Sequence, residues 1–197
     1  MNEKTIASPN WSPRPRGLDD VWGVLLHHTA TAGDSAIAVA KFFAKPESKV
    51  SAHDVVGDDG LVVHCVKPHR AAWHAGPSRL YDWDQDGKLE PWERYANRHT
   101  IGIEICNRGD NRDTFPAVQV RTVALLIRRY DRLCPNLKLR SVTDHERTSL
   151  SGKIDMQPNF PAAKLFWWII HPRLDPPKNV YAELPKWAQR QVDEIKK

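Results

Sequence analysis

The sequence predicts a single α/β domain in which a central mixed β-sheet is flanked by helices. Short apolar runs rich in β-branched residues alternate along the chain with longer segments whose apolar residues recur at helical spacing. Two of the runs, 50–56 and 61–66, flank the turn sequence GDDG at 57–60, which predicts an antiparallel strand pair. The 197 residues suffice for one domain of this kind and are too few for two full ones.

The elements follow residues 1–20, a segment expected to be an extended lead-in because its prolines break regular structure. The expected strands are 21–27, 50–56, 61–66, 101–107 and 137–142, and the expected helices are 34–44, 117–133, 161–170 and 184–197. Asp34 is the expected N-cap of the first helix, and Pro161 suits the first turn of the third. We therefore expect the main domain at 21–172 and a linker with an amphipathic helix at 173–197.

Cysteine usage and apolar content bear on the cellular compartment. The cysteines are odd in number and widely spaced, so we expect buried free thiols and no disulfide framework. The first residues are polar and proline-rich and lack the apolar core of a signal peptide. No apolar run approaches the ~20 residues of a transmembrane helix. We therefore expect synthesis in the cytoplasm without an export signal.

The net charge of +5 favours an anionic partner, and nucleic acid, lipid headgroups and the bacterial cell wall all qualify. The chain has no long basic cluster, no zinc-finger spacing and no RNP-type strand, so nucleic acid is not an expected partner. Charge alone does not choose between the remaining two.

Metal-ligating side chains occur at three separate strand ends or loops. His27 ends the first strand, His145 follows the strand at 137–142, and Asp155 lies in the loop before the helix at 161–170. A catalytic zinc takes three such protein ligands and leaves a fourth position for water. The nine histidines make chance groupings easy, so these residues alone leave a structural role open.

Five motifs in a fixed order make the chain resemble the zinc-dependent N-acetylmuramoyl-L-alanine amidases of the type-2 amidase and peptidoglycan-recognition-protein superfamily. They are LLHHTA (25–30), VSAHDVVGDDG (50–60), AAWHAG (71–76), TIGIEICN (100–107) and DHERTSLSGKIDMQPNF (144–160). The resemblance spans roughly residues 20–172. Two positions depart from the family pattern: Asp54 replaces a tyrosine, and Asp144 replaces a frequent glycine. Neither removes a ligand, and Asp144 is either solvated or packed behind the ligands.

The resemblance implies that His27, His145 and Asp155 bind zinc. It also implies that Glu104 shuttles the proton during amide hydrolysis and that Lys153 stabilises the oxyanion. Because Glu104 stands between two isoleucines on a strand, its side chain should project from the face opposite to theirs. The alternatives are a surface glutamate and a solvated loop lysine.

The resemblance further implies that Trp73 and His74 line the cleft and contact sugar or peptide, and that His53 borders the site. An aromatic face suits the apolar side of a sugar ring. A buried core tryptophan is the competing interpretation of Trp73.

A second metal site is predicted in an insertion at about 77–99, where residues 82–93 match the EF-hand loop pattern D-x-D-x-D-G-x5-E. The calcium ligands would be side-chain oxygens and one carbonyl, from Asp82, Asp84, Asp86, Lys88 and Glu93. Pro77 argues against a long entering helix, so we expect a lone EF-hand-like loop. The alternative is an acidic solvated loop.

The implied function is hydrolysis of the amide bond between N-acetylmuramic acid and L-alanine in peptidoglycan. The missing signal peptide disfavours an exported wall amidase. The basic charge and the cationic amphipathic C-terminal helix favour a phage endolysin, made in the host cytoplasm and released by holin pores to the wall in the periplasm. A cytoplasmic enzyme that recycles anhydro-muropeptides is the first alternative, and a non-catalytic peptidoglycan-binding module is the second.

We expect a monomer. The helix at 184–197 has one apolar face and one charged face, which allows contact with an anionic membrane or, as an alternative, docking on the body of the protein.

Overall fold

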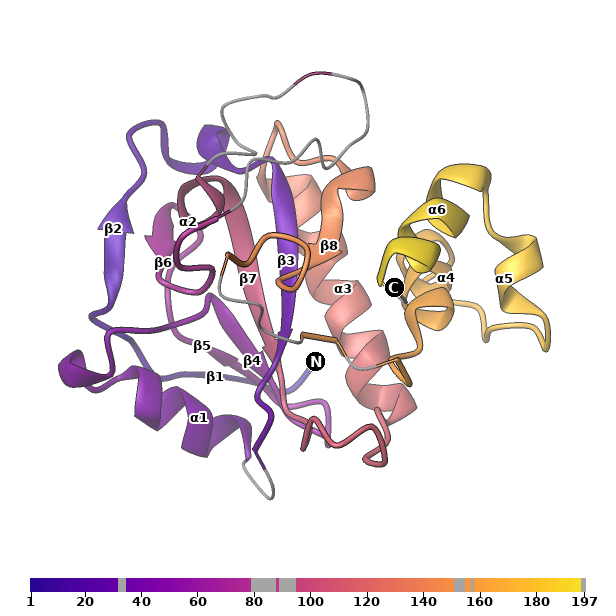
Figure 1. Ribbon diagram of the computed structural model, residues 1–197, viewed down its shortest axis with the longest axis horizontal. Coiled ribbons are helices and arrows are strands. Elements are labelled where there is room, and N and C mark those ends of the chain that lie inside the picture. The colour runs from indigo at the N-terminus through magenta and orange to yellow at the C-terminus, as the bar shows by residue number, and fades with distance from the viewer. Residues whose placement is uncertain (32–34, 79–87, 89–94, 151–154, 157, 196–197) are drawn as a thin grey trace.

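The computed structural model describes residues 1–31, 35–78, 88, 95–150, 155–156 and 158–195 (Figure 1). Its central sheet has six strands, in the spatial order β1 (Glu3–Thr5), β5 (Val62–His64), β4 (Asp54–Val56), β7 (Thr100–Ile105), β3 (Gly23–His28) and β8 (Val142–Asp144). The pair β4–β5 is antiparallel, and the other neighbouring pairs are parallel. The predicted mixed sheet and its antiparallel hairpin are therefore confirmed.

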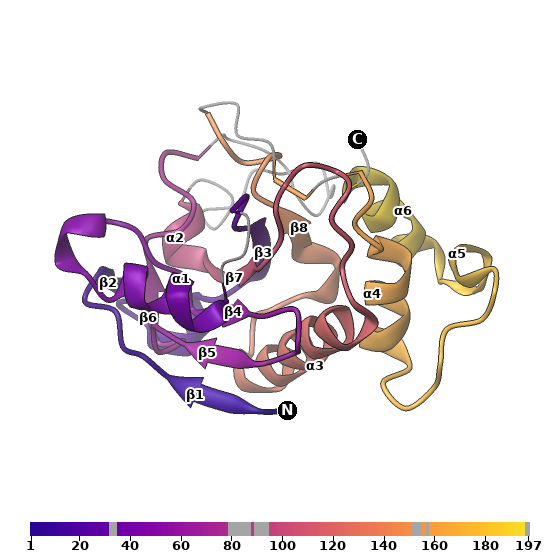
Figure 2. The same ribbon diagram turned by 90° about the horizontal axis from the view of Figure 1, so that it is seen from below.

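Helices cover both faces of this sheet, as predicted. They are α1 (Ala36–Phe43), α2 (Ala96–His99), α3 (Ala117–Leu133), α4 (Ala162–Ile170), α5 (Val180–Glu183) and α6 (Lys186–Ile195). Figures 1 and 2 show α1 on one side of the sheet and α3 and α4 on the other. Each side has its own apolar cluster, the larger one beneath α3 and α4.

The two central strands β3 and β7 separate an apolar face from the face that carries polar groups. Leu26, Ile103 and Ile105 belong to the core beneath α3 and α4. Successive side chains of a strand point to opposite faces. His27 and Glu104 therefore project from the other face, as expected for Glu104 from its flanking isoleucines.

The predicted position of the strand at 137–142 is wrong. Residues Leu139–Ser141 form a 3-10 helix, and β8 starts only at Val142. The backbone N–H of Lys138 donates to the carbonyl of Trp22, and the N–H of Ser141 donates to that of Lys138. These bonds turn the chain before it enters the sheet, so parallel pairing with β3 begins late.

The expectation that prolines prevent regular structure in residues 1–20 is also wrong. β1 adds a parallel strand to the edge of the main sheet, and β2 (Trp11–Pro13) pairs with β6 (Arg70–Ala72) in a separate two-stranded sheet. Proline is tolerated in edge strands of this kind, where its missing N–H breaks no ladder of hydrogen bonds. The strand β6 was not expected from the sequence.

The helix expected at 117–133 is confirmed with the same bounds, and Pro161 immediately precedes α4. The first helix is capped by Ser35 and not by Asp34, which lies outside the described residues. The Ser35 hydroxyl accepts a hydrogen bond from the backbone N–H of Ala38, at 3.3 Å. This is the usual role of an N-cap side chain.

The C-terminal segment folds back onto the body of the protein. The helix expected at 184–197 begins at Lys186, and the short α5 precedes it. Ala188, Val192 and Ile195 are buried in the core cluster that also contains α4 residues. The apolar face is therefore covered by protein, which is the docking alternative. Among the described residues, no helix has the length and apolar character needed to cross a membrane.

Candidate active site

The site lies where the parallel strands β3, β7 and β8 end. His27 is the penultimate residue of β3, Glu104 is the penultimate residue of β7, and His145 directly follows β8. The carboxyl ends of parallel strands meet at the same edge of a sheet, where ligands commonly bind in α/β folds. The topology therefore brings together side chains that are up to 118 positions apart, as from His27 to His145.

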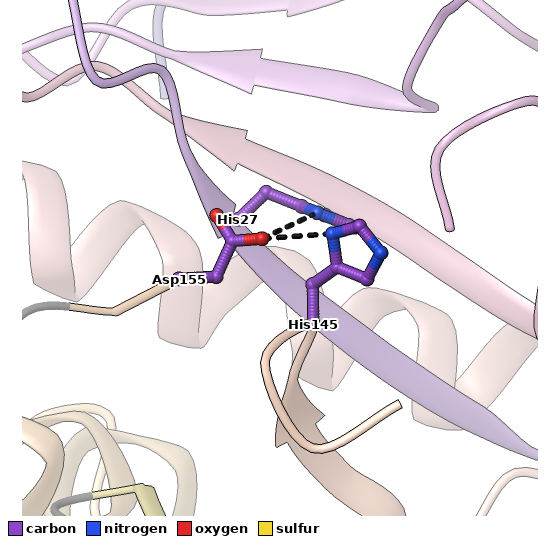
Figure 3. Close-up of side chains that lie close together, drawn as sticks. All are labelled: His27, His145 and Asp155. Atoms are coloured by element: carbon purple, nitrogen blue, oxygen red, sulfur yellow. Dashed lines mark ion pairs between the residues drawn. The ribbon is translucent and has the colours of Figure 1, made fainter. Parts of the chain in front are cut away.

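The structure brings the predicted zinc ligands together (Figure 3). One donor atom from each of His27, His145 and Asp155 lies within 4.8 Å of the others, and all three residues are buried. The Oδ2 atom of Asp155 lies 2.7 Å from His145 Nδ1 and 3.8 Å from His27 Nδ1. Two imidazoles and a carboxylate facing one point are a donor set that suits zinc.

The second ring nitrogen of each histidine is engaged elsewhere. His145 Nε2 lies 3.0 Å from the carbonyl oxygen of Ala75, to which it donates a hydrogen bond. His27 Nε2 lies 3.0 Å from His74 Nδ1. The atoms left for a metal are therefore the two Nδ1 atoms and the carboxylate of Asp155, because a ligating imidazole nitrogen must carry no proton.

Two buried aspartates, the predicted ligand Asp155 and the nearby Asp144, have pKa values shifted in opposite directions. Burial raises the pKa of Asp155, but the nearby side chains of His145, His27 and His28 outweigh burial and lower that pKa overall, so the carboxyl is ionised. Burial raises the pKa of Asp144 to about 7, against a lowering hydrogen bond from the backbone N–H of Arg147. The side chain of Asp144 is buried, which excludes its solvated alternative.

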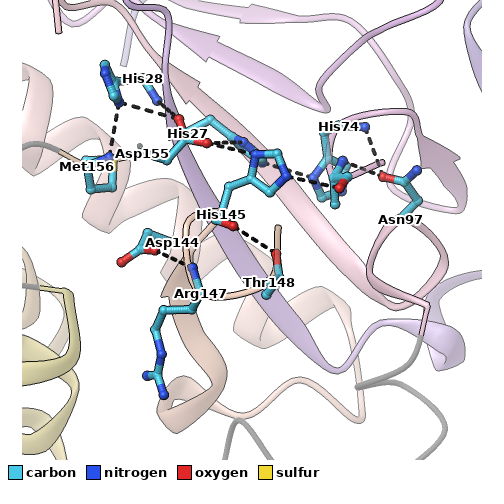
Figure 4. Close-up of polar contacts among 11 residues, drawn as sticks. His27, His28, His74, Asn97, Asp144, His145, Arg147, Thr148, Asp155 and Met156 are labelled. Atoms are coloured by element: carbon cyan, nitrogen blue, oxygen red, sulfur yellow. Dashed lines mark hydrogen bonds and ion pairs between the residues drawn. The ribbon is translucent and has the colours of Figure 1, made fainter. Parts of the chain in front are cut away.

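His28 is a site residue that the sequence did not single out (Figure 4). Its backbone N–H donates to Asp155 Oδ1 at 3.4 Å, and its Nδ1 accepts from the backbone N–H of Met156 at 3.0 Å. Met156 has a left-handed backbone with φ of 59°, which is uncommon for a residue with a side chain. A Cβ on Gly109 would lie 2.7 Å from His28 Nε2, so glycine leaves room for this ring. In the sequence, the two consecutive histidines at the end of a strand were the feature that could have indicated this role.

The predicted ligands open into a cleft of about 350 Å³. Glu104, Trp73 and His74 line this cleft together with the three predicted ligands. Trp73 is half-buried, and its indole N–H donates to the hydroxyl of Ser12 at 2.8 Å. It is therefore part of the cleft wall and not a core tryptophan.

His53 borders the site only from behind, through its ring contact with the cleft residue His74 at a centroid distance of 5.7 Å. Its side chain is fully buried and is not among the cleft residues. The Nδ1 atom accepts from the backbone N–H of Gly102 at 2.9 Å, and Nε2 donates to the carbonyl of Arg70 at 3.0 Å. Burial, aided by the nearby Arg14 guanidinium, lowers its pKa to about 3. His53 is a neutral structural group that ties two strands together.

Several predicted site residues lie outside the described residues. They are Lys153 and four of the five expected calcium ligands, Asp82, Asp84, Asp86 and Glu93. Lys88 is described, but the other four expected calcium ligands are not.

Comparison with known proteins gives a family and a fold. The family model for N-acetylmuramoyl-L-alanine amidase matches residues 17–158. No curated protein matches the chain. The structure resembles a selenomethionine derivative of AmpD, with a TM-score of 0.67 and 22% identity over 86% of this chain and 95% of that one.

Two further solved structures are similar. A mutant endolysin from Bacillus subtilis has a TM-score of 0.54 and 26% identity, covering 85% of this chain and 94% of that one. The amidase AmiD from E. coli, in complex with the substrate anhydro-N-acetylmuramic acid-L-Ala-D-γ-Glu-L-Lys, has a TM-score of 0.57 and 21% identity, covering 88% and 77%. Since the family model spans well over half of the sequence, this protein belongs to the N-acetylmuramoyl-L-alanine amidase family.

Proposed function

We propose that the protein is a zinc-dependent amidase that hydrolyses the bond between N-acetylmuramic acid and L-alanine in peptidoglycan. The observation that carries this proposal is the convergence of His27, His145 and Asp155 within 4.8 Å in the lining of a cleft that Glu104 also lines. Family membership supports the reaction, and the buried nitrogen and oxygen donors support the metal.

The protein groups divide the chemistry between them. A zinc ion held by the three ligands would lower the pKa of a water molecule and polarise the scissile carbonyl. Glu104 accepts the proton of the attacking water and delivers it to the leaving amine of L-alanine. We assign Lys153, which lies outside the described residues, to stabilising the negative charge on the carbonyl oxygen. Trp73 offers an aromatic wall to the sugar or to the stem peptide.

The biological setting that we favour is a phage endolysin, which acts on polymeric wall. The net charge of +5 supports contact with an anionic polymer, and the neighbours include an endolysin. The alternative is recycling of soluble anhydro-muropeptides, which the likeness to AmiD in complex with such a compound keeps open. A binding module without activity is disfavoured because the complete donor set is present.

Mass spectrometry after digestion distinguishes these settings. The protein is incubated in parallel with purified polymeric peptidoglycan and with a soluble anhydro-muropeptide. Release of stem peptides that begin with L-alanine from the polymer supports the endolysin. Cleavage of the soluble compound alone supports the recycling enzyme. If neither is cleaved by the zinc-loaded protein, the amidase proposal is wrong.

We also retain the calcium loop at 82–93 as a proposal, supported by its complete match to the EF-hand loop pattern. Removal of calcium with a calcium-selective chelator, with zinc retained, should lower the melting temperature of the protein. An unchanged melting temperature and unchanged activity would remove this proposal.

A further inference from the structure

His74 lies behind the predicted zinc ligand His27 and contacts it directly (Figure 4). Its Nδ1 atom is 3.0 Å from His27 Nε2, and the two rings meet edge to face with centroids 5.1 Å apart. His74 thus contacts the ligand through the nitrogen that faces away from the metal position. Of the two nitrogens in such a contact, one must donate and the other must accept, so the proton positions of the two rings are linked.

The proton positions on the two rings can be assigned from the hydrogen bond that His74 makes through its other ring nitrogen, Nε2. The hydroxyl of Thr100 donates to the backbone carbonyl of Ala96, at 2.6 Å, so its oxygen can only accept from a second partner. That partner is His74 Nε2, at 3.3 Å. His74 Nε2 therefore carries the proton, and in the neutral ring His74 Nδ1 is an acceptor.

The proton position on His74 determines which nitrogen of His27 carries a proton. Because His74 Nδ1 accepts, His27 Nε2 must donate, and a neutral His27 then has an unprotonated Nδ1. This Nδ1 is the atom that faces Asp155 and His145. The relay of hydrogen bonds, from Ala96 through Thr100 and His74 to His27, thus gives the ligand the tautomer that a metal requires.

Packing and backbone contacts hold the His74 ring in this orientation. An added Cβ at Gly102 would lie 2.4 Å from His74 Cγ, so a side chain at this position in β7 would displace the ring. The Asn97 side-chain oxygen accepts from the backbone N–H groups of His74 and Ala75, at 2.9 and 2.7 Å. The histidine of AAWHAG and the glycine of TIGIEICN are thus parts of one packing unit.

We infer that His74 and Thr100 are positioning residues that hold His27 in the Nδ1-unprotonated tautomer and so raise the affinity of the site for zinc. This inference rests on the proposed zinc function and concerns groups that would not touch the metal. Outer contacts of this kind orient a ligating histidine, and their loss typically weakens metal binding about 10–100-fold.

The test compares Thr100→Val with Thr100→Ser. Valine keeps the shape of threonine and removes the hydroxyl, whereas serine keeps the hydroxyl and removes a methyl group. Thr100 is fully buried and does not line the cleft, so neither change alters a substrate contact. Zinc affinity is measured without substrate, by competition with a chromogenic chelator. We expect Thr100→Val to bind zinc about 10-fold more weakly, and Thr100→Ser to remain close to wild type.

A second pair of variants tests the same hydrogen bonds at His74, so that the inference can still be tested if Thr100→Val does not fold. His74→Asn retains an acceptor close to the position of Nδ1, and His74→Phe retains a ring without an acceptor. The expected order of zinc affinity is wild type, then His74→Asn, then His74→Phe, with similar unfolding midpoints of the metal-free variants. Long-range ¹H–¹⁵N spectra of the metal-free protein should show His74 protonated at Nε2 in wild type and Thr100→Ser.

Equal zinc affinity in Thr100→Val and Thr100→Ser, or His74 protonated at Nδ1 in wild type, would overturn the inference. A raised KM with unchanged zinc affinity in His74→Phe would also overturn it, because His74 would then be a substrate contact. Failure of the amidase proposal is distinguishable: the wild type would bind zinc with the expected dependence on Thr100 and still cleave no muramoyl amide.

Discussion

His27 and Glu104 are paired residues on the adjacent parallel strands β3 and β7. Paired positions in a parallel sheet present their side chains on the same face, so backbone hydrogen bonds hold the predicted ligand beside the predicted proton carrier. A shift of one residue in this register would turn one of the two side chains to the opposite face of the sheet. The sheet itself therefore aligns these two groups.

Replacement of Glu104 by glutamine should remove the proton carrier without changing the shape of the side chain. We expect the turnover number to fall about 10²–10⁴-fold, which is the usual range for loss of a general acid–base group. Zinc content should remain that of wild type, since Glu104 is not among the three predicted ligands. Near-normal turnover in a zinc-loaded Glu104→Gln variant would assign the proton transfer to another group.

Replacement of His28 tests how Asp155 is held. His28→Asn keeps an acceptor for the backbone N–H of Met156, and His28→Leu removes it while filling much of the same volume. We expect His28→Leu to bind zinc about 10-fold more weakly and His28→Asn to bind nearly as wild type, in the same chelator competition. Equal affinities would show that the contact at 3.0 Å does not position Asp155.

The departure from the family pattern at Asp54 predicts a pH effect on stability. Asp54 is buried, its Oδ1 lies 2.6 Å from His64 Nδ1, and Tyr130 donates to its other oxygen. The hydrogen bond with Asp54 raises the pKa of His64, and Glu3 at 3.2 Å on β1 contributes. The folded state therefore holds this proton more tightly than the unfolded state.

The stabilising contribution of His64 should be complete below its unfolded pKa near 6.5 and disappear as pH rises through the higher folded pKa. Urea unfolding at several pH values should show wild type losing stability over this range and His64→Gln losing less. His69→Gln, at an exposed position after the same hairpin, is the matched control and should follow wild type. A wild-type curve that coincides with that of His64→Gln would contradict the assignment.

The docked C-terminal helix predicts a difference between two nearby substitutions. Val192 is fully buried in the core cluster, and Val192→Ala should lower the free energy of unfolding by roughly 1–3 kcal/mol. Arg190 is exposed on the same helix, and Arg190→Ala should change it by less than about 0.5 kcal/mol. Equal effects, measured by urea unfolding, would indicate that α6 does not dock in solution.

Long periodic segments and ordered motifs could be predicted from the sequence, because they depend on local spacing. The helix α3 and the β4–β5 hairpin are examples, and the convergence of His27, His145 and Asp155 followed from a resemblance over most of the chain. The start of β8 could not be predicted, since it depends on a hydrogen bond from the backbone N–H of Lys138 to the carbonyl of Trp22, a residue distant in sequence that directly precedes β3.

The contacts behind the ligands were also beyond the sequence. His53, His74 and His28 look alike as sequence letters, yet one is a buried structural group, one contacts a ligand and one holds the backbone after Asp155. Which role each plays depends on neighbours brought together by tertiary packing, such as the glycines that leave room for two of these rings.

The most direct test of the account measures zinc content and muramoyl-amide cleavage together, in wild type and in Asp155→Ala. We predict that wild type binds zinc, loses cleavage of the bond between N-acetylmuramic acid and L-alanine when zinc is stripped, and regains it when zinc is restored. Asp155→Ala should retain neither zinc nor activity. Full cleavage by metal-stripped wild type, or by Asp155→Ala, would contradict the account.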